Sequence, residues 1–215
     1  MNNLTAAEED ALREICNIGV SQGARQLSIL LGDEVIITVP SVDIIDVKNV
    51  NEDLGINEHT KVVAVSQHLH GSFDGTVSLM FHTQEGKSLV KNLIGNVHVI
   101  SGVDIRDLEH EALVEIGNII ISSCMSAIAN FLGEEISFGV PFFRETSLHQ
   151  LLTATENDEL TNKQLGSALI IKTTLQASKS DVSGALVMAF TMASADHLIV
   201  KVDDLVNKYR SDLTE

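Results

Sequence analysis

Two short stretches of the chain carry side chains that could act together on a partner. Residues 14–19 (EICNIG) and 115–120 (EIGNII) each place an Asn three residues after a Glu. The carboxylates of Glu14 and Glu115 could pair with a Lys, whereas Asn17 and Asn118 could orient a water molecule through their amides. An amide cannot act as a general acid or base, so these pairs favour positioning over proton transfer.

The neighbouring residues place each pair along one stripe of a helix, which we expect to face solvent. Two sets of four residues are spaced by four, three and four positions: Asp10, Glu14, Asn17 and Ser21, and Glu111, Glu115, Asn118 and Ser122. A polar stripe is ordinarily a solvated helix face. Asn is a weak helix former, however, and its presence at mid-helix in both copies favours a functional stripe.

The chain repeats itself after 118 − 17 = 101 residues, which indicates an internal duplication. Identical residues at this offset include Leu12 and Leu113, Gly32 and Gly133, and the only two prolines, Pro40 and Pro141. Residues 75–94 resemble 184–202 at the larger offset of 184 − 75 = 109, so the second half holds a longer segment between Pro141 and Gly184. We predict a single domain over 1–215 made of two repeats, about 5–97 and 104–208.

Local patterns predict a helix, three strands and a helix in each repeat. Thr5 and Glu8 form a capping box that begins a helix over 6–31, ended by Gly32, and its counterpart covers 107–132 and ends at Gly133. Strands are expected within 34–47 and 134–143 and at 61–70, 75–82, 166–175 and 184–191, with further helices at 85–95 and 194–207 and polar connections at 46–60 and 144–165. Each Pro marks a strand edge, bulge or end. The predicted fold class is α+β, an internally duplicated pseudo-twofold domain with long motif helices packed on a largely antiparallel sheet.

Composition and charge argue against several classes of function. The net charge of −16 disfavours a nucleic-acid partner, because phosphate binding needs clustered Lys and Arg. Cys16 and Cys124 lie in apolar helical sequence at non-equivalent places, which suggests packing thiols in a reducing cytoplasm rather than a disulfide. The most apolar long run, 184–202, is broken by Asp196 and His197, so we expect no membrane span or membrane partner.

Other candidate chemistries lack the side chains they need. His68 and His70 share one face of a predicted strand, but no third metal ligand is recognisable, so no metal site is expected. Ser21 and Ser122 have no neighbouring base, so nucleophilic catalysis is not supported.

The two motifs resemble those of the CheC/CheX/FliY phosphatases of bacterial and archaeal chemotaxis. That family's pattern is Asp or Ser, then Glu four residues on, Asn three further, and Pro after 40 − 17 − 1 = 22 intervening residues. The matching residues here are Asp10, Glu14, Asn17 and Pro40, and then Glu111, Glu115, Asn118 and Pro141. Glu111 departs from the Asp or Ser of the pattern. Two motifs in one chain resemble CheC most closely, because CheX has one and FliY-type proteins carry an added flagellar-switch domain that this chain is too short to hold.

The resemblance implies a phosphatase that hydrolyses the aspartyl phosphate of a CheY-like response regulator. Asn17 or Asn118 would orient the attacking water, and Glu14 or Glu115 would pair with the regulator's Lys. Asp10, Glu111, Pro40 and Pro141 would support the motifs. The chain would bind no cofactor itself, because the Mg²⁺ belongs to the regulator. The alternative is a non-catalytic interaction module that binds CheY or the deamidase CheD, with an amphipathic helix at 145–154 as the candidate docking element.

Overall fold

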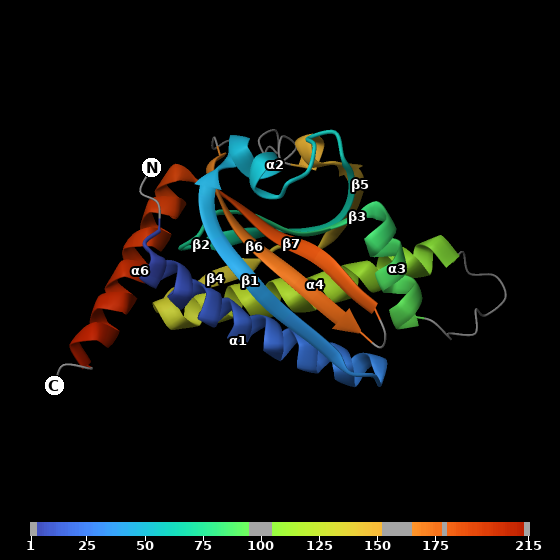
Figure 1. The fold of residues 1–215 in the computed structure, drawn as a ribbon, viewed down its shortest axis with the longest axis horizontal. Coiled ribbons are helices and arrows are strands. Elements are labelled where there is room, and N and C mark those ends of the chain that lie inside the picture. Colours follow the sequence, from blue (N-terminus) through green and yellow to red (C-terminus); the bar gives the residue numbers. More distant parts are fainter. Residues whose placement is uncertain (1–3, 95–104, 152–164, 178–179, 213–215) are drawn as a thin grey trace.

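The two long motif helices lie side by side against one face of a large antiparallel sheet (Figure 1). The computed structural model describes residues 4–94, 105–151, 165–177 and 180–212. Its elements, in chain order, are α1 (Ala6–Leu31), β1 (Val35–Asp46), the 3₁₀ turn η1 (Val47–Asn49), α2 (Val50–Asp53), β2 (Lys61–Gly71), β3 (Gly75–His82), α3 (Thr83–Ile94), α4 (Ile105–Leu132), β4 (Ile136–Phe138), β5 (Phe142–Ser147), β6 (Leu165–Ala177), β7 (Ser180–Thr191) and α6 (Met192–Asp212). The helices and strands predicted for each repeat are therefore present, apart from the helix at 145–154, and the predicted α+β class with an antiparallel sheet is confirmed.

The sheet interleaves the two halves of the chain. Its strand order is β1-β6-β7-β3-β2-β4, and β5 pairs with β2 beside β4. Strand β1 of the first half thus pairs with β6 of the second, while β4 and β5 of the second half pair with β2 of the first. The counterparts in the two halves are β1 and β4–β5, β2 and β6, and β3 and β7. Replacing each strand by its counterpart gives the same order read from the opposite edge, as a twofold relation between the halves requires. The repeat boundaries at 5–97 and 104–208 stay a prediction, because residues 95–104 lie outside the described part of the chain.

Local sequence signals fix the ends of α1 as expected. The Thr5 side chain accepts a hydrogen bond from the Glu8 N–H, and the Glu8 carboxylate accepts one from the Thr5 N–H. Gly32 ends the helix in the left-handed conformation at φ 66°, and Gly133 has the same conformation at φ 68° after α4. A residue without a side chain adopts this conformation at little cost, so glycine is the expected stop at both sites.

Helices α1 and α4 cross in close, antiparallel contact. A Cβ atom on Gly19 would lie 2.8 Å from the Cα of Cys124, and one on Gly23 would lie 3.3 Å from the Oγ of Ser123. Contacts run from Cys124 and Ala127 to Ser123 and Ile119 as the α1 numbering rises, which sets the antiparallel direction. Helix α4 contains a stretch, His110–Leu132, that is long and apolar enough to cross a membrane, but α4 packs against α1 and the sheet. The run 184–202 forms strand β7 and the start of α6 instead of one continuous helix.

Three connections differ from the sequence-based expectation. Strand β5 extends to Ser147 along β2, so residues 144–147 are strand and not a polar connection. The helix predicted at 145–154 begins only at residue 148 and is described to 151, and the remainder lies outside the described residues. The connection at 46–60 contains η1 and α2. In the first two cases pairing with β2 outweighs the local amphipathic pattern, because the sheet offers the backbone a hydrogen-bonded partner.

An ion-pair cluster ties α6 to the loop that follows α4. The Glu134 carboxylate lies 2.7 Å from Lys201 Nζ and 3.1 Å from His197 Nε2. Figure 1 shows α6 at one end of the sheet and α3 at the other. The cluster therefore anchors the C-terminal helix to the motif helix α4.

Glu134 gives the fold a defined dependence on pH. Hydrogen bonds from Lys201, Ser72 and His197 lower the pKa of this carboxyl from 4.5 to about 2, with the largest effect from Lys201. Because the folded pKa lies below the unfolded one, the stabilisation is complete above about pH 4.5 and is lost as the pH falls toward about 2. The difference in unfolding free energy between the unaltered chain and Glu134→Gln should therefore shrink over this window, as measured by urea denaturation. Glu135→Gln, at an exposed neighbouring position, is the matched control. A Glu134→Gln deficit that is as large near pH 3 as at neutral pH would contradict the assignment.

Candidate functional site

The first motif places an exposed carboxylate beside an anchored amide. Glu14 is exposed on α1, whereas Asn17 is half-buried, and its Oδ1 accepts the backbone N–H of Val39 at 2.9 Å. Val39 directly precedes Pro40 on β1, where the register with β6 shifts between Thr38 and Ser41. Pro40 has no N–H and interrupts the ladder at this edge strand. The separation between Asn17 and Val39 thus gives the motif spacing a physical reason, because the helix amide binds the strand at its bulge.

The second motif repeats the arrangement with a different anchor. Glu115 is exposed and Asn118 is half-buried on α4, but Asn118 Oδ1 accepts a hydrogen bond from Gln67 Nε2 at 3.0 Å. The same Nε2 lies 3.3 Å from the carbonyl oxygen of Gly139. Residues 139–141 separate β4 from β5, and the register with β2 shifts there by one residue, so Pro141 also stands at a bulge of an edge strand.

Backbone partners decide which way both amides face. The N–H of Val39 can only donate, so the atom of Asn17 that meets it is the oxygen. The carbonyl of Gly139 can only accept, so Gln67 turns its nitrogen there and presents an N–H to the oxygen of Asn118. Each Oδ1 keeps a second lone pair, and each Nδ2 carries two N–H donors. The two motifs therefore present amides with the same anchored atom.

A small residue lets α4 approach the strand that anchors it. A Cβ atom on Gly117 would lie 2.5 Å from the Cβ of Val65 on β2, so α4 rests directly on this strand. The equivalent position in α1 is Cys16, which is fully buried. Its thiol meets Cys124 of α4, and a hydrogen bond with that residue and burial raise the pKa of Cys16 well above its usual value. Both cysteines are free, so the interpretation of packing thiols is confirmed.

The structure corrects the expectation for the two Asn side chains. Both were expected on solvent-facing ground, but each is half-buried at a helix–strand contact, where the oxygen of Asn17 binds the bulge at Val39 and that of Asn118 binds Gln67 across from the second bulge. The anchors, the Val39 N–H and the Gln67 side chain, were missed by sequence reasoning. The available signal was the polar Gln67 in an otherwise apolar row on one face of β2, formed by Val63, Val65 and Leu69.

The supporting residues differ between the copies. Asp10 is exposed and forms an ion pair with Arg13 at 2.6 Å, whereas Glu111 is exposed on α4, where Val114 replaces the Arg. Ser122 donates a hydrogen bond to the Asn118 carbonyl within the helix, and Ser21 is exposed.

The histidine pair weighed as a metal site has a different arrangement. The His68 ring hydrogen-bonds Thr76 at 3.1 Å and packs on Phe142, whereas His70 is exposed. Among the residues that the structure describes, no three His, Cys, Asp or Glu side chains converge in a way that could hold a metal ion.

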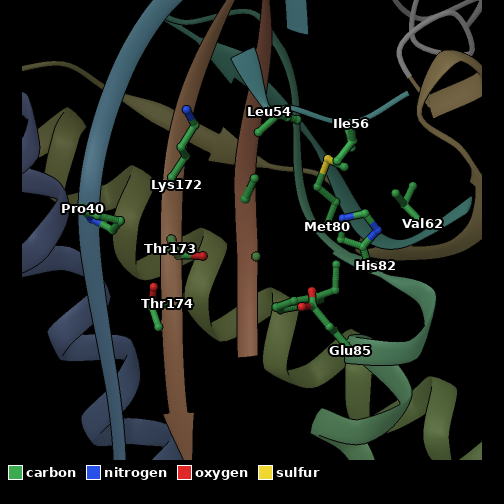
Figure 2. Close-up of a pocket in the computed structure, with 13 residues that line it drawn as sticks. Pro40, Leu54, Ile56, Val62, Met80, His82, Glu85, Lys172, Thr173 and Thr174 are labelled. Carbon is green, nitrogen blue, oxygen red and sulfur yellow. The ribbon is translucent and has the colours of Figure 1, made fainter. Parts of the chain in front are cut away.

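A cavity among the described residues reaches the motifs only at Pro40. It measures about 380 Å³ and is lined by Pro40, Met80, Glu85, Lys172 and neighbouring side chains (Figure 2). Val62, Met80 and Ala185 of its lining belong to the cluster on the sheet face opposite α1 and α4. Neither Glu nor Asn of either motif lines it. Glu14 and Glu115 sit instead on exposed helix surface beside the half-buried Asn side chains, which suits contact with a macromolecule better than enclosure of a small molecule.

The comparisons with known proteins match the motif regions. A family model described as the CheC-like family matches residues 8–44 and 108–144, which include both Glu and Asn pairs and both prolines. The CheY-P phosphatase CheC of Bacillus subtilis (strain 168) is 23% identical over 93% of this chain and 95% of its own length. A putative CheY-P phosphatase CheC1 of Halobacterium salinarum is 28% identical over 60% of this chain, and the match spans only 65% of that relative.

A solved structure supports the fold. The crystal structure of Thermotoga maritima FliY superposes with a TM-score of 0.69 at 21% identity, covering 95% of this chain and 98% of that one. Both motif regions therefore match the CheC-like family, and the chain resembles CheC over most of its length.

The anchoring of Asn17 should be visible in stability. Asn17→Ala removes the acceptor of the Val39 N–H and should lower the free energy of unfolding by about 1–3 kcal/mol, the cost of an unsatisfied buried donor. Asn17→Asp keeps an acceptor oxygen and should stay closer to the unaltered chain. Denaturant titrations of both variants measure this difference. Equal losses in the two variants would show that the hydrogen bond to Val39 does not hold the helix to the strand.

Proposed function

We propose that this chain hydrolyses the aspartyl phosphate of a CheY-like response regulator, with Asn17 and Asn118 orienting the attacking water at two separate sites. The observation that carries the proposal is the shared geometry of the two motifs, an exposed Glu beside an Asn amide whose oxygen is anchored. A solvated helix face needs no such anchoring. The names of the matched CheC relatives support the choice of substrate.

The chemistry that these side chains can supply is positioning. In phosphoryl transfer the water oxygen bonds to phosphorus as the bond to the aspartate oxygen breaks, and the aspartate leaves as a carboxylate. The amide holds the water in line for this attack, and a fixed amide avoids the entropy of ordering it at each turnover. The Mg²⁺ and the regulator's Lys stay with the partner, and Glu14 or Glu115 pairs with that Lys in a charge-assisted hydrogen bond.

The sites are proposed to work independently. Helices α1 and α4 run antiparallel and cross where Gly19 faces Cys124 and Gly23 faces Ser123. Asn17 precedes this crossing on α1, and Asn118 precedes it on α4, so the two lie toward opposite ends of the contact. Neither amide is therefore placed to assist the other.

Single and double Asn variants test this independence. Asn17→Ala should leave the second site working, and Asn118→Ala should leave the first, whereas the double variant should approach the regulator's own rate of dephosphorylation. Loss of one preorganised polar group at a reacting centre typically costs roughly 10²–10³ in rate. The measurement is the decay of phosphorylated regulator, with Gln22→Ala at an exposed position of α1 as the control. A single variant as inactive as the double would show that the sites are coupled or that one is silent.

Charge reversal tests the role of the two Glu side chains. The double variant Glu14→Lys, Glu115→Lys should lose binding to the phosphorylated regulator, because a Lys would then face the regulator's Lys. Asp203→Lys, Asp204→Lys changes the net charge by the same amount at exposed positions of α6 and is the matched control. Titration of each variant with the regulator gives the dissociation constants. Equal weakening by both double variants would indicate a general charge effect and would contradict a specific pairing of Glu14 or Glu115 with the regulator's Lys.

A further inference from the structure

Gln67 is a buried polar residue in an apolar row of β2. Val63, Val65 and Leu69 belong to the core cluster on the sheet face that carries α1 and α4, and the alternation of the strand puts Gln67 in the same row. Its side chain is only 1% exposed. Burial of an amide is costly unless its groups are hydrogen-bonded, so this position calls for a reason beyond packing.

Only half of this buried amide is satisfied. Its Nε2 donates to Asn118 Oδ1 at 3.0 Å and lies 3.3 Å from the Gly139 carbonyl oxygen. Its Oε1 is buried and has no hydrogen-bond partner among the residues that the structure describes. An apolar side chain of similar size would avoid the cost of that unsatisfied oxygen. Gln67 is therefore poorly explained by stability and well explained by the donor that it presents to Asn118.

The first site has a different residue at the corresponding place. On β6, Thr173 lies between the partners of Thr38 and Ser41 and thus across from Val39 and Pro40. On β2, Gln67 lies across from Val140 and Pro141, because His68 already pairs with Gly139 and Ser66 with Phe142. Asn17 is anchored by a backbone N–H at this bulge, whereas Asn118 is anchored by a side chain. The two sites therefore differ in what holds the amide.

The two bulges also differ in how far their Val side chains are exposed to solvent. Val39 is buried at 3%, and its N–H points to Asn17, whereas Val140 is 84% exposed. At the second bulge, Gln67 contacts both the Asn118 amide and the carbonyl of Gly139. Gln67 thus takes the place that the strand backbone holds in the first site.

We propose that Gln67 is the positioning residue of the second site, which fixes the orientation of the Asn118 amide and has no part in the first site. This inference rests on the proposed function. Gln67 does not meet the regulator itself and acts only through Asn118. Loss of its donor frees the Asn118 amide to rotate, so the water is held in line for a smaller fraction of the time.

The two single-Asn backgrounds provide matched hosts for one substitution. Gln67→Met keeps a side chain of similar length and removes the donor. In the Asn17→Ala background, where only the second site works, Gln67→Met should lower kcat by about 10- to 100-fold with little change in KM, the scale for a misplaced reacting group. In the Asn118→Ala background, where only the first site works, the same substitution should change kcat by less than about twofold, within the scatter of a neutral substitution.

The pair of backgrounds separates positioning from a merely structural role. A fold damaged by Gln67→Met would lose activity in both backgrounds, and that outcome would overturn the proposal. No loss in the Asn17→Ala background would overturn it as well. If the double Asn variant hydrolyses phosphorylated regulator as fast as the unaltered chain, the proposed function itself fails, and this result is distinct from either of the others.

A spectroscopic readout follows the amide without reference to activity. The side-chain NH₂ resonances of Asn118 should shift or broaden in Gln67→Met, while those of Asn17 should be unchanged. The thermal unfolding midpoint should change little, because the substitution removes an unsatisfied buried oxygen while it leaves Asn118 Oδ1 and the Gly139 carbonyl without this donor. Unchanged Asn118 resonances would show that Gln67 does not hold this amide, and the proposal would be withdrawn.

Discussion

The hydrogen bond that anchors the oxygen of a helix Asn beside a broken edge strand is the constraint on which both motifs depend. Pro40 and Pro141 stand at bulges of β1 and of the β4–β5 edge, where the ladder shifts register. At the first bulge the oxygen of Asn17 accepts a hydrogen bond from the N–H of Val39. At the second, the oxygen of Asn118 accepts one from Gln67 on the facing strand. This bond fixes the rotation of the helix about its axis and leaves the preceding Glu exposed. In the first motif the spacing between Asn17 and Pro40 is thus a distance set by packing a helix on the strand that follows it.

Duplication explains why the chain has this anchored Asn twice. Because the strands of the two halves interleave in one sheet, neither half could hold its motif without the other. The first motif helix packs on β1, but β1 pairs with β6 of the second half. The second motif helix packs on β2 of the first half, which supplies Gln67. Each motif therefore depends on residues of the other repeat. The two anchors have diverged, one using backbone and the other a side chain, while the anchored atom has stayed the same.

Much of this organisation was predictable from sequence because it rests on local signals. The capping box at Thr5 and the glycines at 32 and 133 specify helix ends through backbone geometry that only a few residues adopt readily. The repeat of Glu, Asn and Pro pointed to both motifs. The partial burial of Asn17 and Asn118 was not predictable, because it depends on which strand each helix covers. The contact of Cys16 with Cys124 and the extension of β5 to Ser147 likewise depend on register between distant segments.

The most direct test of the account is a crystal structure of this chain bound to the regulator in a stable phosphoryl-like state. We expect the Asn17 or Asn118 amide to lie within hydrogen-bonding distance of the water position in line with the phosphoryl group. In that complex its Oδ1 should still accept from Val39 or Gln67, and Glu14 or Glu115 should pair with the regulator's Lys. A regulator seated at the cavity of Figure 2, or anywhere that leaves both Asn side chains outside its active site, would contradict the central claim.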